Sequence, residues 1–467
     1  MIPPAENASS PGAQDIRAAA VHSAASKILR RVVPVFAVMM MCNQLNRSNI
    51  GYAQEHLEAD LGIGAAAYGL GAGLFFITYM LCEVPSNLLM ARFGAKIWLS
   101  RICVSWGIVS ACTLFVQGPV SFYALRFLLG AAEAGFVPAV LYYFSTWLPN
   151  DYRGRANARY AVGALVAFSV SGPLSGPLLG MDGVLGLHGW QWMFLMEGLL
   201  SVGVGVFAFL WLDSRIEEVT WLNRHEKAAL TEAIETEERA AAEKYGAERA
   251  SFWNVLRDPK IALFVFIYFA TQMSIYANTF WLPSIVADIP GTNAVTVGLL
   301  SSLPWLCAIV AMFGLARVGD RTGRRKPILV GQLLVAGVGT LVAALVSPWW
   351  ALVWLCVAAM GFKSISPVFW PIVQRTVNPM TIGVAIAVIN SVANLGGFVA
   401  PFGFGLVKQH TGSTQWALIA LGCLSFVAAF ACLWVRDRDD AEQAGAAPES
   451  RTEGIDPVQR DAAEPAR

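Results

Sequence analysis

The segment from Ala417 to Val435 reads ALIALGCLSFVAAFACLWV and contains no charged side chain. An apolar run of about 20 residues has the length of a helix that crosses the hydrocarbon core of a bilayer. The whole chain has a similar character, since 56% of its 467 residues are hydrophobic and only 14% are charged. A water-soluble domain carries far less apolar surface than this. The sequence therefore predicts an integral membrane protein.

Similar apolar blocks recur along the chain and predict twelve transmembrane helices in all. We expect an all-α membrane protein with two pseudo-symmetric bundles of six helices each. The expected spans of the first bundle are residues 32–52, 66–90, 97–117, 121–144, 157–180 and 191–212. Those of the second bundle are residues 260–283, 295–316, 327–346, 349–371, 382–407 and 415–435.

Composition divides the chain into five parts, because three polar segments flank the two apolar halves. A basic, Ala- and Ser-rich arm at residues 1–30 has no signal-peptide pattern and is expected in the cytoplasm. The polar stretch at residues 213–258 has apolar residues at helical spacing, which predicts a cytoplasmic connecting helix. The bundles then occupy residues 31–212 and 259–436, and a charged tail at residues 437–467 is expected to be disordered and cytoplasmic.

Basic residues gather in the short loops on one side of the predicted membrane, whereas the loops on the other side are mostly acidic or neutral. Short loops rich in Lys and Arg face the cytoplasm. We therefore predict a multi-pass protein of the cell inner membrane with both termini in the cytoplasm. The basic loop residues are Arg30, Arg31, Arg92, Lys96, Arg153, Arg155, Arg159, Arg317, Arg321, Arg324, Arg325, Lys326, Arg375, Arg436 and Arg438.

An internal repeat indicates the same layout. Arg92–Lys96 reads RFGAK after the second predicted helix, and Arg321–Arg325 reads RTGRR after the eighth, at an offset of 229 residues. Two halves related by a pseudo-twofold axis place a binding site between them, near the middle of the bilayer.

Several motifs resemble the major facilitator superfamily and, within it, the anion:cation symporter family. They are EVPSN at 83–87, RFLLGAAEAGFVP at 126–138, GWQW at 189–192, EG at 197–198, GDRTGRR at 319–325 and NSVANLGG at 390–397. The resemblance covers roughly residues 28–436 and implies an alternating-access transporter of carboxylates such as tartrate, phthalate or 4-hydroxyphenylacetate.

The GDRTGRR segment resembles the cytoplasmic loop motif of that superfamily, whose charged residues latch neighbouring helices. The resemblance gives this gating role to Asp320, Arg321 and Arg324. The copy in the first half lacks the aspartate. Glu83 and Glu197 also match motif positions, and we interpret both as structural or gating charges.

Charged side chains inside predicted spans are costly and usually mark function. Arg47 lies in the first span, where its forked donors suit a carboxylate, and the resemblance makes it the main anion-binding residue. A snorkelling arginine near the helix end is the structural alternative. Arg126 and Glu133 lie seven residues apart on one helix face, about 10 Å along its axis. The resemblance makes Glu133 the proton-carrying carboxylate and Arg126 an exchangeable partner; a fixed ion pair is the alternative.

Lys363 lies in the tenth span, within one residue of the repeat position that corresponds to Glu133. We expect it to face the same cavity, where it binds a second carboxylate or else neutralises Glu133 as a standing pair. Members of the family commonly carry an aspartate just before the first-helix arginine, where this chain has Asn46. An asparagine cannot carry a proton, so fewer protons are expected to move with each substrate if relatives use both acids.

Uncharged polar residues complete the predicted site. Tyr79 resembles a substrate-contacting tyrosine of the family, and a packed aromatic side chain is the alternative. The seventh and eleventh spans supply the opposite wall through Gln272, Tyr276, Asn278, Asn390 and Asn394. Helix–helix hydrogen bonds would explain the asparagines equally well.

The predicted function is proton-coupled uptake of a small organic carboxylate, aromatic or hydroxylated and possibly a dicarboxylate such as phthalate or tartrate. Export or exchange of an anion by the same fold is the alternative. The expected partners are the small organic anion, protons and the lipid bilayer, and we expect a monomer. A net charge of +1 gives no indication of nucleic-acid binding. The eight cysteines lack metal-ligand spacing, and no catalytic motif is found, so neither an enzyme, a metal site nor a cofactor is predicted.

Overall fold

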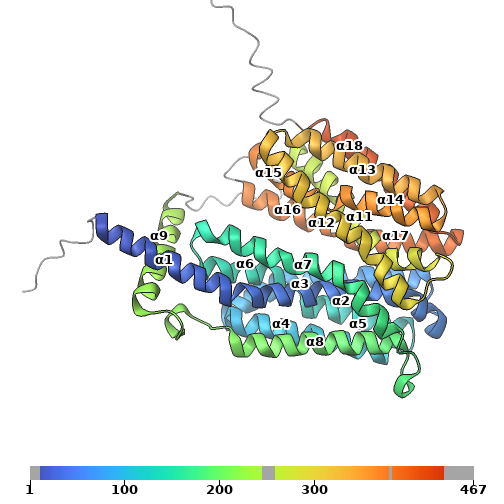
Figure 1. Cartoon of the computed structure of the whole chain (residues 1–467), viewed down its shortest axis with the longest axis horizontal. Helices are drawn as coiled ribbons and strands as arrows, with labels where there is room; N and C mark the ends of the chain where they lie inside the picture. Colours follow the sequence, from blue (N-terminus) through green and yellow to red (C-terminus); the bar gives the residue numbers. More distant parts are fainter. Residues whose placement is uncertain (1–10, 245–257, 378–380, 436–467) are drawn as a thin grey trace, which may run out of the picture.

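The computed structural model describes residues 11–244, 258–377 and 381–435, and within these ranges the regular structure is entirely helical. Figure 1 shows two groups of roughly parallel and antiparallel helices that lie side by side. Eleven helices or pairs of consecutive helices in the described part are long and apolar enough to cross a membrane. Together with α2 (Val33–Leu61), they make twelve spans, as predicted.

The first bundle contains the elements from α2 to α8. Their bounds are α2 (Val33–Leu61), α3 (Ala65–Phe93), α4 (Ala95–Ala111) with the 3-10 turn η1 (Cys112–Phe115), α5 (Pro119–Glu133), α6 (Phe136–Trp147), α7 (Asn150–Leu179), η2 (Val184–Gly186) and α8 (Gly189–Trp211). The second bundle contains α11 (Pro259–Ala287), α12 (Ala294–Thr322), α13 (Arg325–Leu345), α14 (Pro348–Phe362), α15 (Ser366–Thr376), α16 (Ile382–Asn394), α17 (Gly396–Thr411) and α18 (Gln415–Cys432).

Helix α2 is not among these eleven spans, because its middle carries a run of polar residues. Asn43, Asn46 and Asn49 are all buried there. The helix packs mainly on α7 and α8, and there Asn46 and Asn49 donate to side chains of α8, whereas the Asn43 amide has no hydrogen-bond partner among the described residues.

Two spans break at positions that correspond in the repeat. The fourth span ends as α5 at Glu133 and restarts as α6 after Gly135, whose φ of 84° lies in the left-handed region that favours glycine. The tenth span ends as α14 at Phe362 and restarts as α15 at Ser366. The breaks place Glu133 and Lys363 at helix ends.

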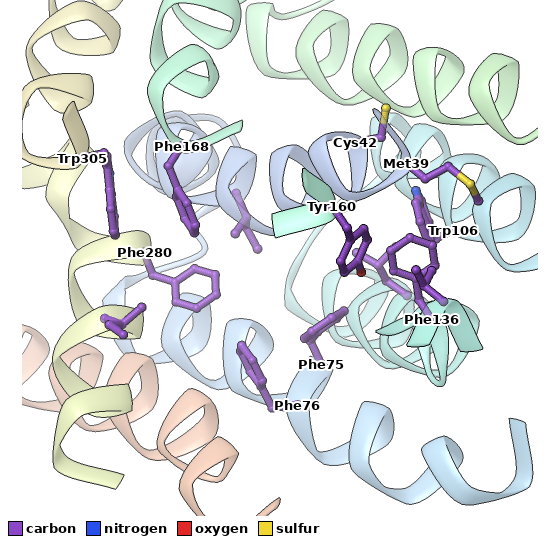
Figure 2. Packing of buried hydrophobic residues seen from close by; sticks show 14 of the residues in the cluster. Met39, Cys42, Phe75, Phe76, Trp106, Phe136, Tyr160, Phe168, Phe280 and Trp305 are labelled. Atoms are coloured by element: carbon purple, nitrogen blue, oxygen red, sulfur yellow. The ribbon is translucent and has the colours of Figure 1, made fainter. Parts of the chain in front are cut away.

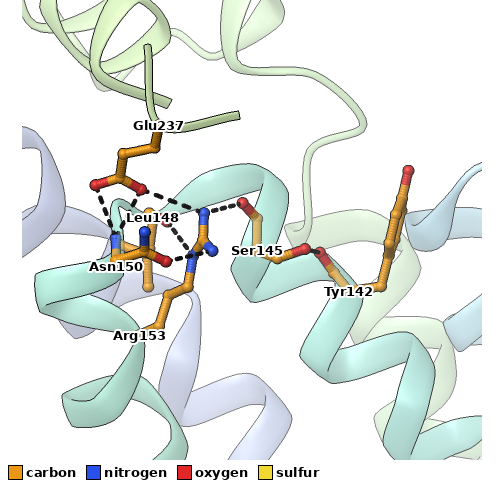
Figure 3. Close-up of polar contacts among 6 residues, drawn as sticks. All are labelled: Tyr142, Ser145, Leu148, Asn150, Arg153 and Glu237. Atoms are coloured by element: carbon orange, nitrogen blue, oxygen red, sulfur yellow. Dashed lines mark hydrogen bonds and ion pairs between the residues drawn. The ribbon is translucent and has the colours of Figure 1, made fainter. Parts of the chain in front are cut away.

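Helix α1 (Pro11–Arg31) and helix α9 (Arg224–Lys244) pack on each other where α2 begins and α3 ends, which we call the α1/α9 end (Figure 1). A second contact fastens α9 to the first bundle: Glu237 accepts hydrogen bonds from the backbone N–H of Asn150 and forms an ion pair with Arg153 (Figure 3). Part of the predicted N-terminal arm is therefore a docked helix. The predicted tail at residues 437–467 lies outside the described residues.

The two bundles touch at the end opposite α1 and α9. There Gly172 of α7 packs so closely on Gly298 of α12 that a Cβ at Gly172 would lie 1.9 Å from the Gly298 carbonyl oxygen. Gly73 of α3 packs on Phe398 of α17 in the same half. Val84 lies three turns farther along the same face of α3, yet 67% of it is exposed. The bundles are thus closed at the opposite end and separate toward the α1/α9 end.

Candidate functional site

An ion pair between α2 and α5 forms the centre of the candidate site. Arg47 donates from Nε to Oε1 of Glu133, whose side chain is completely buried. The second oxygen of Glu133, Oε2, is also buried and has no hydrogen-bond partner among the described residues. Glu133 is the last residue of α5, where the helix dipole is negative and disfavours a carboxylate charge. The ion pair with Arg47 thus stabilises the ionised form of Glu133.

Aromatic rings surround this pair. Phe75 and Tyr79 lie one turn apart on α3 and stack with ring centroids 5.9 Å apart. The Arg47 guanidinium lies 5.1 Å from the Phe75 centroid and 4.9 Å from that of Tyr79. Figure 2 shows both Phe75 and Phe76 among the packed rings, with Phe76 toward Phe280 and Phe75 toward Tyr160. Rings at these distances stabilise a cation that has left bulk water.

Arg126 joins the same cluster from α5. Its guanidinium also lies 5.1 Å from the Phe75 centroid, and only 4% of the residue is exposed. Its Nε donates to the carbonyl oxygen of Gly71 at 3.4 Å, while its terminal nitrogens make no hydrogen bond or ion pair with the described residues. Arg47 and Arg126 therefore contact the same ring, that of Phe75. The terminal N–H groups of Arg126 are available to bind a ligand.

The opposite wall comes from the second bundle. Gln272 and Tyr276 of α11 both donate to Oδ1 of Asn394, at 3.2 Å and 3.3 Å. The Tyr276 ring lies 4.5 Å from the Phe76 ring, which joins this wall to α3. Asn390, one turn before Asn394, is exposed.

Lys363 faces the first bundle from the break after α14. Its Nζ lies 4.4 Å from the ring centroid of Phe168 and 5.7 Å from that of Trp305, and these two rings stack on each other. Lys363 makes no ion pair with Glu133 or any other described acidic residue. The interpretation of Lys363 as a standing partner of Glu133 therefore does not match the geometry.

A small polar cavity lies between the bundles beside these rings. Residues of α2, α7, α11 and α12 surround it, namely Ser48, Tyr52, Phe168, Ser171, Asn278 and Trp305. The predicted polar residue Asn278 thus lines a gap between the bundles, although its amide also donates to the Ser274 carbonyl.

A second buried acid lies behind α2, away from the second bundle. Glu197 of α8 is 2% exposed and accepts hydrogen bonds from Asn49 at 3.0 Å and Ser175 at 2.8 Å. Asn46 donates to Ser201 and to the Cys42 carbonyl, so it binds α8 to α2. Glu197 therefore links α8 to α2 and α7 within the first bundle.

The loop motif lies at the α1/α9 end of the second bundle. Asp320 forms an ion pair with Arg325 at 2.8 Å, so the observed bridge connects α12 to the start of α13. No hydrogen bond or ion pair of Arg321 or Arg324 is found among the described residues. Glu83 is half-buried on α3 and likewise has no hydrogen bond within the described part.

Sequence reasoning missed Phe75 and Phe168, two of the rings that contact the cations. Phe75 precedes Tyr79 by four residues and so shares its helix face, which was the available signal. Phe168 has no such signal, because it meets Lys363 only where α7 passes α14.

Comparisons with known proteins agree with this architecture. The family model described as Major Facilitator Superfamily matches residues 36–401 and 264–463. The "Quinolone resistance transporter" of Acinetobacter baumannii is 40% identical over 384 residues, which are 82% of this chain and 88% of that protein. The "Putative tartrate transporter" of Agrobacterium vitis is 37% identical over 420 residues, which are 90% and 96% of the two chains.

A solved structure shares the fold at low sequence identity. The bacterial homologue of the human lysosomal transporter Spinster, in an inward-facing and occupied conformation, superposes with a TM-score of 0.71 at 14% identity and covers 88% of this chain and 97% of that one. The extended family match and the similarity to full-length relatives confirm the prediction from the motifs: the chain belongs to the Major Facilitator Superfamily of membrane transporters.

Proposed function

We propose that the protein carries a small organic carboxylate across the inner membrane together with a proton, by alternating access. The observation that supports this most directly is the ion pair of Arg47 with the buried Glu133. Arg47 is the kind of group that binds a carboxylate, and its present partner is a carboxylate that can be neutralised by one proton.

The pair provides a mechanism for coupling by competition. While Glu133 is ionised, it occupies Nε of Arg47. Protonation of Glu133 removes that charge and leaves the guanidinium free for the carboxylate of the substrate. Because linkage is reciprocal, a bound substrate anion raises the proton affinity of Glu133 by the same factor as the proton raises the affinity for substrate.

The remaining predicted residues divide between the two bundles. Arg126 offers terminal N–H groups beside Arg47, whereas Lys363 offers an ammonium on the other side of the gap. A dicarboxylate could thus engage one cation in each bundle, and the amide and hydroxyl groups of Gln272, Tyr276 and Asn394 could bind its hydroxyl groups. Substrate that bridges the bundles favours their closure around it.

The stacked rings of Phe75 and Tyr79 support an aromatic or hydroxylated carboxylate, and the tartrate name of the Agrobacterium vitis relative supports the same class. With both termini in the cytoplasm, as the basic loops predict, the separation of the bundles at the α1/α9 end corresponds to a state open to the cytoplasm. We expect the functional unit to be a monomer.

Transport by purified protein in proteoliposomes tests this proposal. Tartrate, phthalate and 4-hydroxyphenylacetate are offered one at a time, first in counterflow and then under an inward proton gradient. We expect saturable counterflow of at least one of them, and its accumulation when the outside is acidic. Arg47→Lys keeps the positive charge but loses the paired N–H donors of the guanidinium. We therefore expect the affinity for the carboxylate substrate to fall by about tenfold or more. Arg155→Lys, at an exposed position of α7, is the matched control. Absence of saturable transport of every carboxylate would refute the proposal.

Export of an anion is a second candidate, because one relative is named for quinolone resistance. The same vesicles distinguish the two directions. Uptake that survives collapse of the proton gradient but requires anion inside would indicate an exchanger. Accumulation driven by an acidic lumen would indicate an exporter.

A further inference from the structure

An apolar groove lies on the outer surface of the first bundle, far from the Arg47 site. It runs between the start of α2 and the end of α8, at the α1/α9 end, and has a volume of about 490 Å³. Its apolar lining includes Pro34, Val38, Leu200, Gly203, Phe207 and Trp211. The α8 residues recur every three or four positions and form one stripe along that helix.

The floor of the groove is open. A Cβ added at Gly203 would meet no atom within 4 Å, although Gly203 lies inside α8. Val38 and Phe207 on the two sides are both exposed. The two helices thus leave a slot that the protein's own side chains do not fill.

Two arginines stand at the mouth of this slot. Arg30 is exposed and makes no hydrogen bond or ion pair with the described residues. The Arg31 guanidinium lies 4.4 Å from the ring of Trp211 and 5.4 Å from that of Trp221. Its Nε is buried without a partner in the described part of the chain.

The surroundings fix the backbone of Arg31 and leave its charge uncompensated. Trp211 donates from Nε1 to the Arg31 carbonyl oxygen at 3.2 Å. Asp213, two residues after Trp211, accepts a hydrogen bond from Trp221 and makes no ion pair with Arg31. Within the described residues, the mouth therefore carries two positive charges that no acid neutralises.

We propose that this groove binds an anionic phospholipid, with the phosphate on Arg30 and Arg31 and one acyl chain between α2 and α8. The charge of the mouth complements a phosphodiester, and Arg forms paired hydrogen bonds with phosphate oxygens. Below the mouth, the lining is apolar and matches a hydrocarbon chain. Basic pockets between spans on the cytoplasmic side, where anionic lipids are enriched, recruit such head groups. Inorganic phosphate would use the mouth alone, and a water-soluble partner cannot enter a slot at the depth of the bilayer.

Native mass spectrometry of the full chain in detergent tests the proposal with two probes that have identical acyl chains, phosphatidylglycerol and phosphatidylcholine. We expect the wild type to retain phosphatidylglycerol selectively. The double variant R30Q/R31Q should weaken that binding by about 25-fold, or about fivefold for each arginine, and leave phosphatidylcholine unchanged. Arg155→Gln, an exposed arginine on α7, is the charge control.

A second variant tests the slot itself. Gly203→Phe places a side chain where the acyl chain is proposed to lie, so it should lower phosphatidylglycerol retention although both arginines remain. Gly314→Phe, at another exposed helix glycine with open space around it, is the matched control. Equal retention of the two lipids by the wild type, unchanged retention in R30Q/R31Q, or complete displacement by millimolar sodium phosphate would each overturn the proposal. If Gly203→Phe does not fold, the arginine variant still decides the result.

Discussion

Glu133 and Lys363 occupy the ends of two helices that break at corresponding positions in the two halves of the protein. Glu133 is the last residue of α5, and Lys363 directly follows the last residue of α14. A helix C-terminus carries partial negative charge, which favours an ammonium and disfavours a carboxylate. The helix dipole thus favours the protonated form of Glu133 in the first bundle. In the second bundle, it stabilises the ammonium of Lys363.

Glu133→Gln tests the coupling that the ion pair implies. Glutamine preserves the shape of the side chain but leaves Arg47 free at every pH. We therefore expect counterflow to persist, the pH dependence of substrate affinity to disappear, and accumulation under an inward proton gradient to fall to the equilibrium ratio of about one. Measurement of counterflow and of gradient-driven uptake in the same vesicles separates these effects.

Glu197→Gln is the control for Glu133→Gln. Glu197 is equally buried, but its partners are Asn49 and Ser175, so it does not compete for a substrate-binding cation. We expect this variant to keep proton-driven accumulation. If the Glu133 variant still accumulates substrate with the gradient, Glu133 is not the proton carrier.

Lys363→Met tests the second cation. Methionine has a similar length and packs well on Phe168 and Trp305, so the expected change is loss of charge rather than of packing. We predict that dicarboxylate affinity falls by about tenfold or more, while monocarboxylate affinity changes by less than about threefold. Competition of each anion against a labelled substrate measures both values.

Lys408→Met provides the comparison for that variant. Lys408 also lies over an aromatic ring, with Nζ 5.3 Å from Trp281, but it belongs to the end at which the bundles are closed. Its substitution should leave the ratio of the two affinities unchanged. An equal effect of Lys363→Met on both classes of anion would contradict a role in binding a second carboxylate.

The sequence predicts the helices well, because each span is a long apolar block whose burial in lipid requires no knowledge of its neighbours. Even α2 can be predicted, because a span is needed there to keep the basic loops on one side of the membrane, although its polar centre lowers its hydropathy. Membership of the superfamily follows from motifs at loops and helix breaks. Helix α1 is harder to predict, since its buried face is short and half of it is alanine: Ala24, Ala25, Ile28 and Leu29.

The arrangement of the site is only partly contained in the sequence. Their positions inside apolar spans indicate that Arg47, Arg126, Glu133 and Lys363 need partners, but do not indicate which partners they find. The contact between Arg47 and Glu133 spans 86 residues and depends on how α2 packs against the break after α5. The aromatic neighbours of Lys363 come from α7 and α12, whose crossing follows from tertiary packing alone.

Gly172→Ala tests the closure of the bundles. An added Cβ would lie 1.9 Å from the Gly298 carbonyl oxygen, a backbone atom that cannot rotate away. Helices α7 and α12 must then separate at the closed end. We predict at least about tenfold slower transport, because alternating access requires both closed states. Gly314→Ala, which has open space around it, should transport normally.

Spin labels report the same change directly. Val184 and Val295 are exposed residues at the closed end, one in each bundle, and accept labels after the native cysteines are replaced. In the Gly172 variant, we expect the population with the shorter distance to decrease. An unchanged distance distribution would mean that this glycine contact does not determine closure.

Glu226→Gln tests the docking of α1 on α9, outside the membrane. Glu226 is buried, which disfavours its charge, but hydrogen bonds from Lys27, Ser23 and the backbone of Asn223 outweigh this and hold the pKa of Glu226 below its usual value of 4.5. A lowered pKa in the docked state means that docking gains stability above pH 4.5 and loses it as the pH falls through the lower value. We expect α1 to detach in the wild type on acidification below pH 4.5, and the variant to show no such transition.

A spin label at Ala19, an exposed residue of α1, measures this docking through its mobility between pH 7 and pH 3. At pH 7 the Glu226→Gln variant should already be more mobile, since the lost charged hydrogen bonds weaken docking by about 1–2 kcal/mol. Glu232→Gln is the matched control on the same helix: its ion pair with Arg17 is largely exposed and contributes about 1 kcal/mol or less. The label should then respond to acid as in the wild type. Identical acid transitions in the wild type and in Glu226→Gln would show that another group controls the contact between α1 and α9.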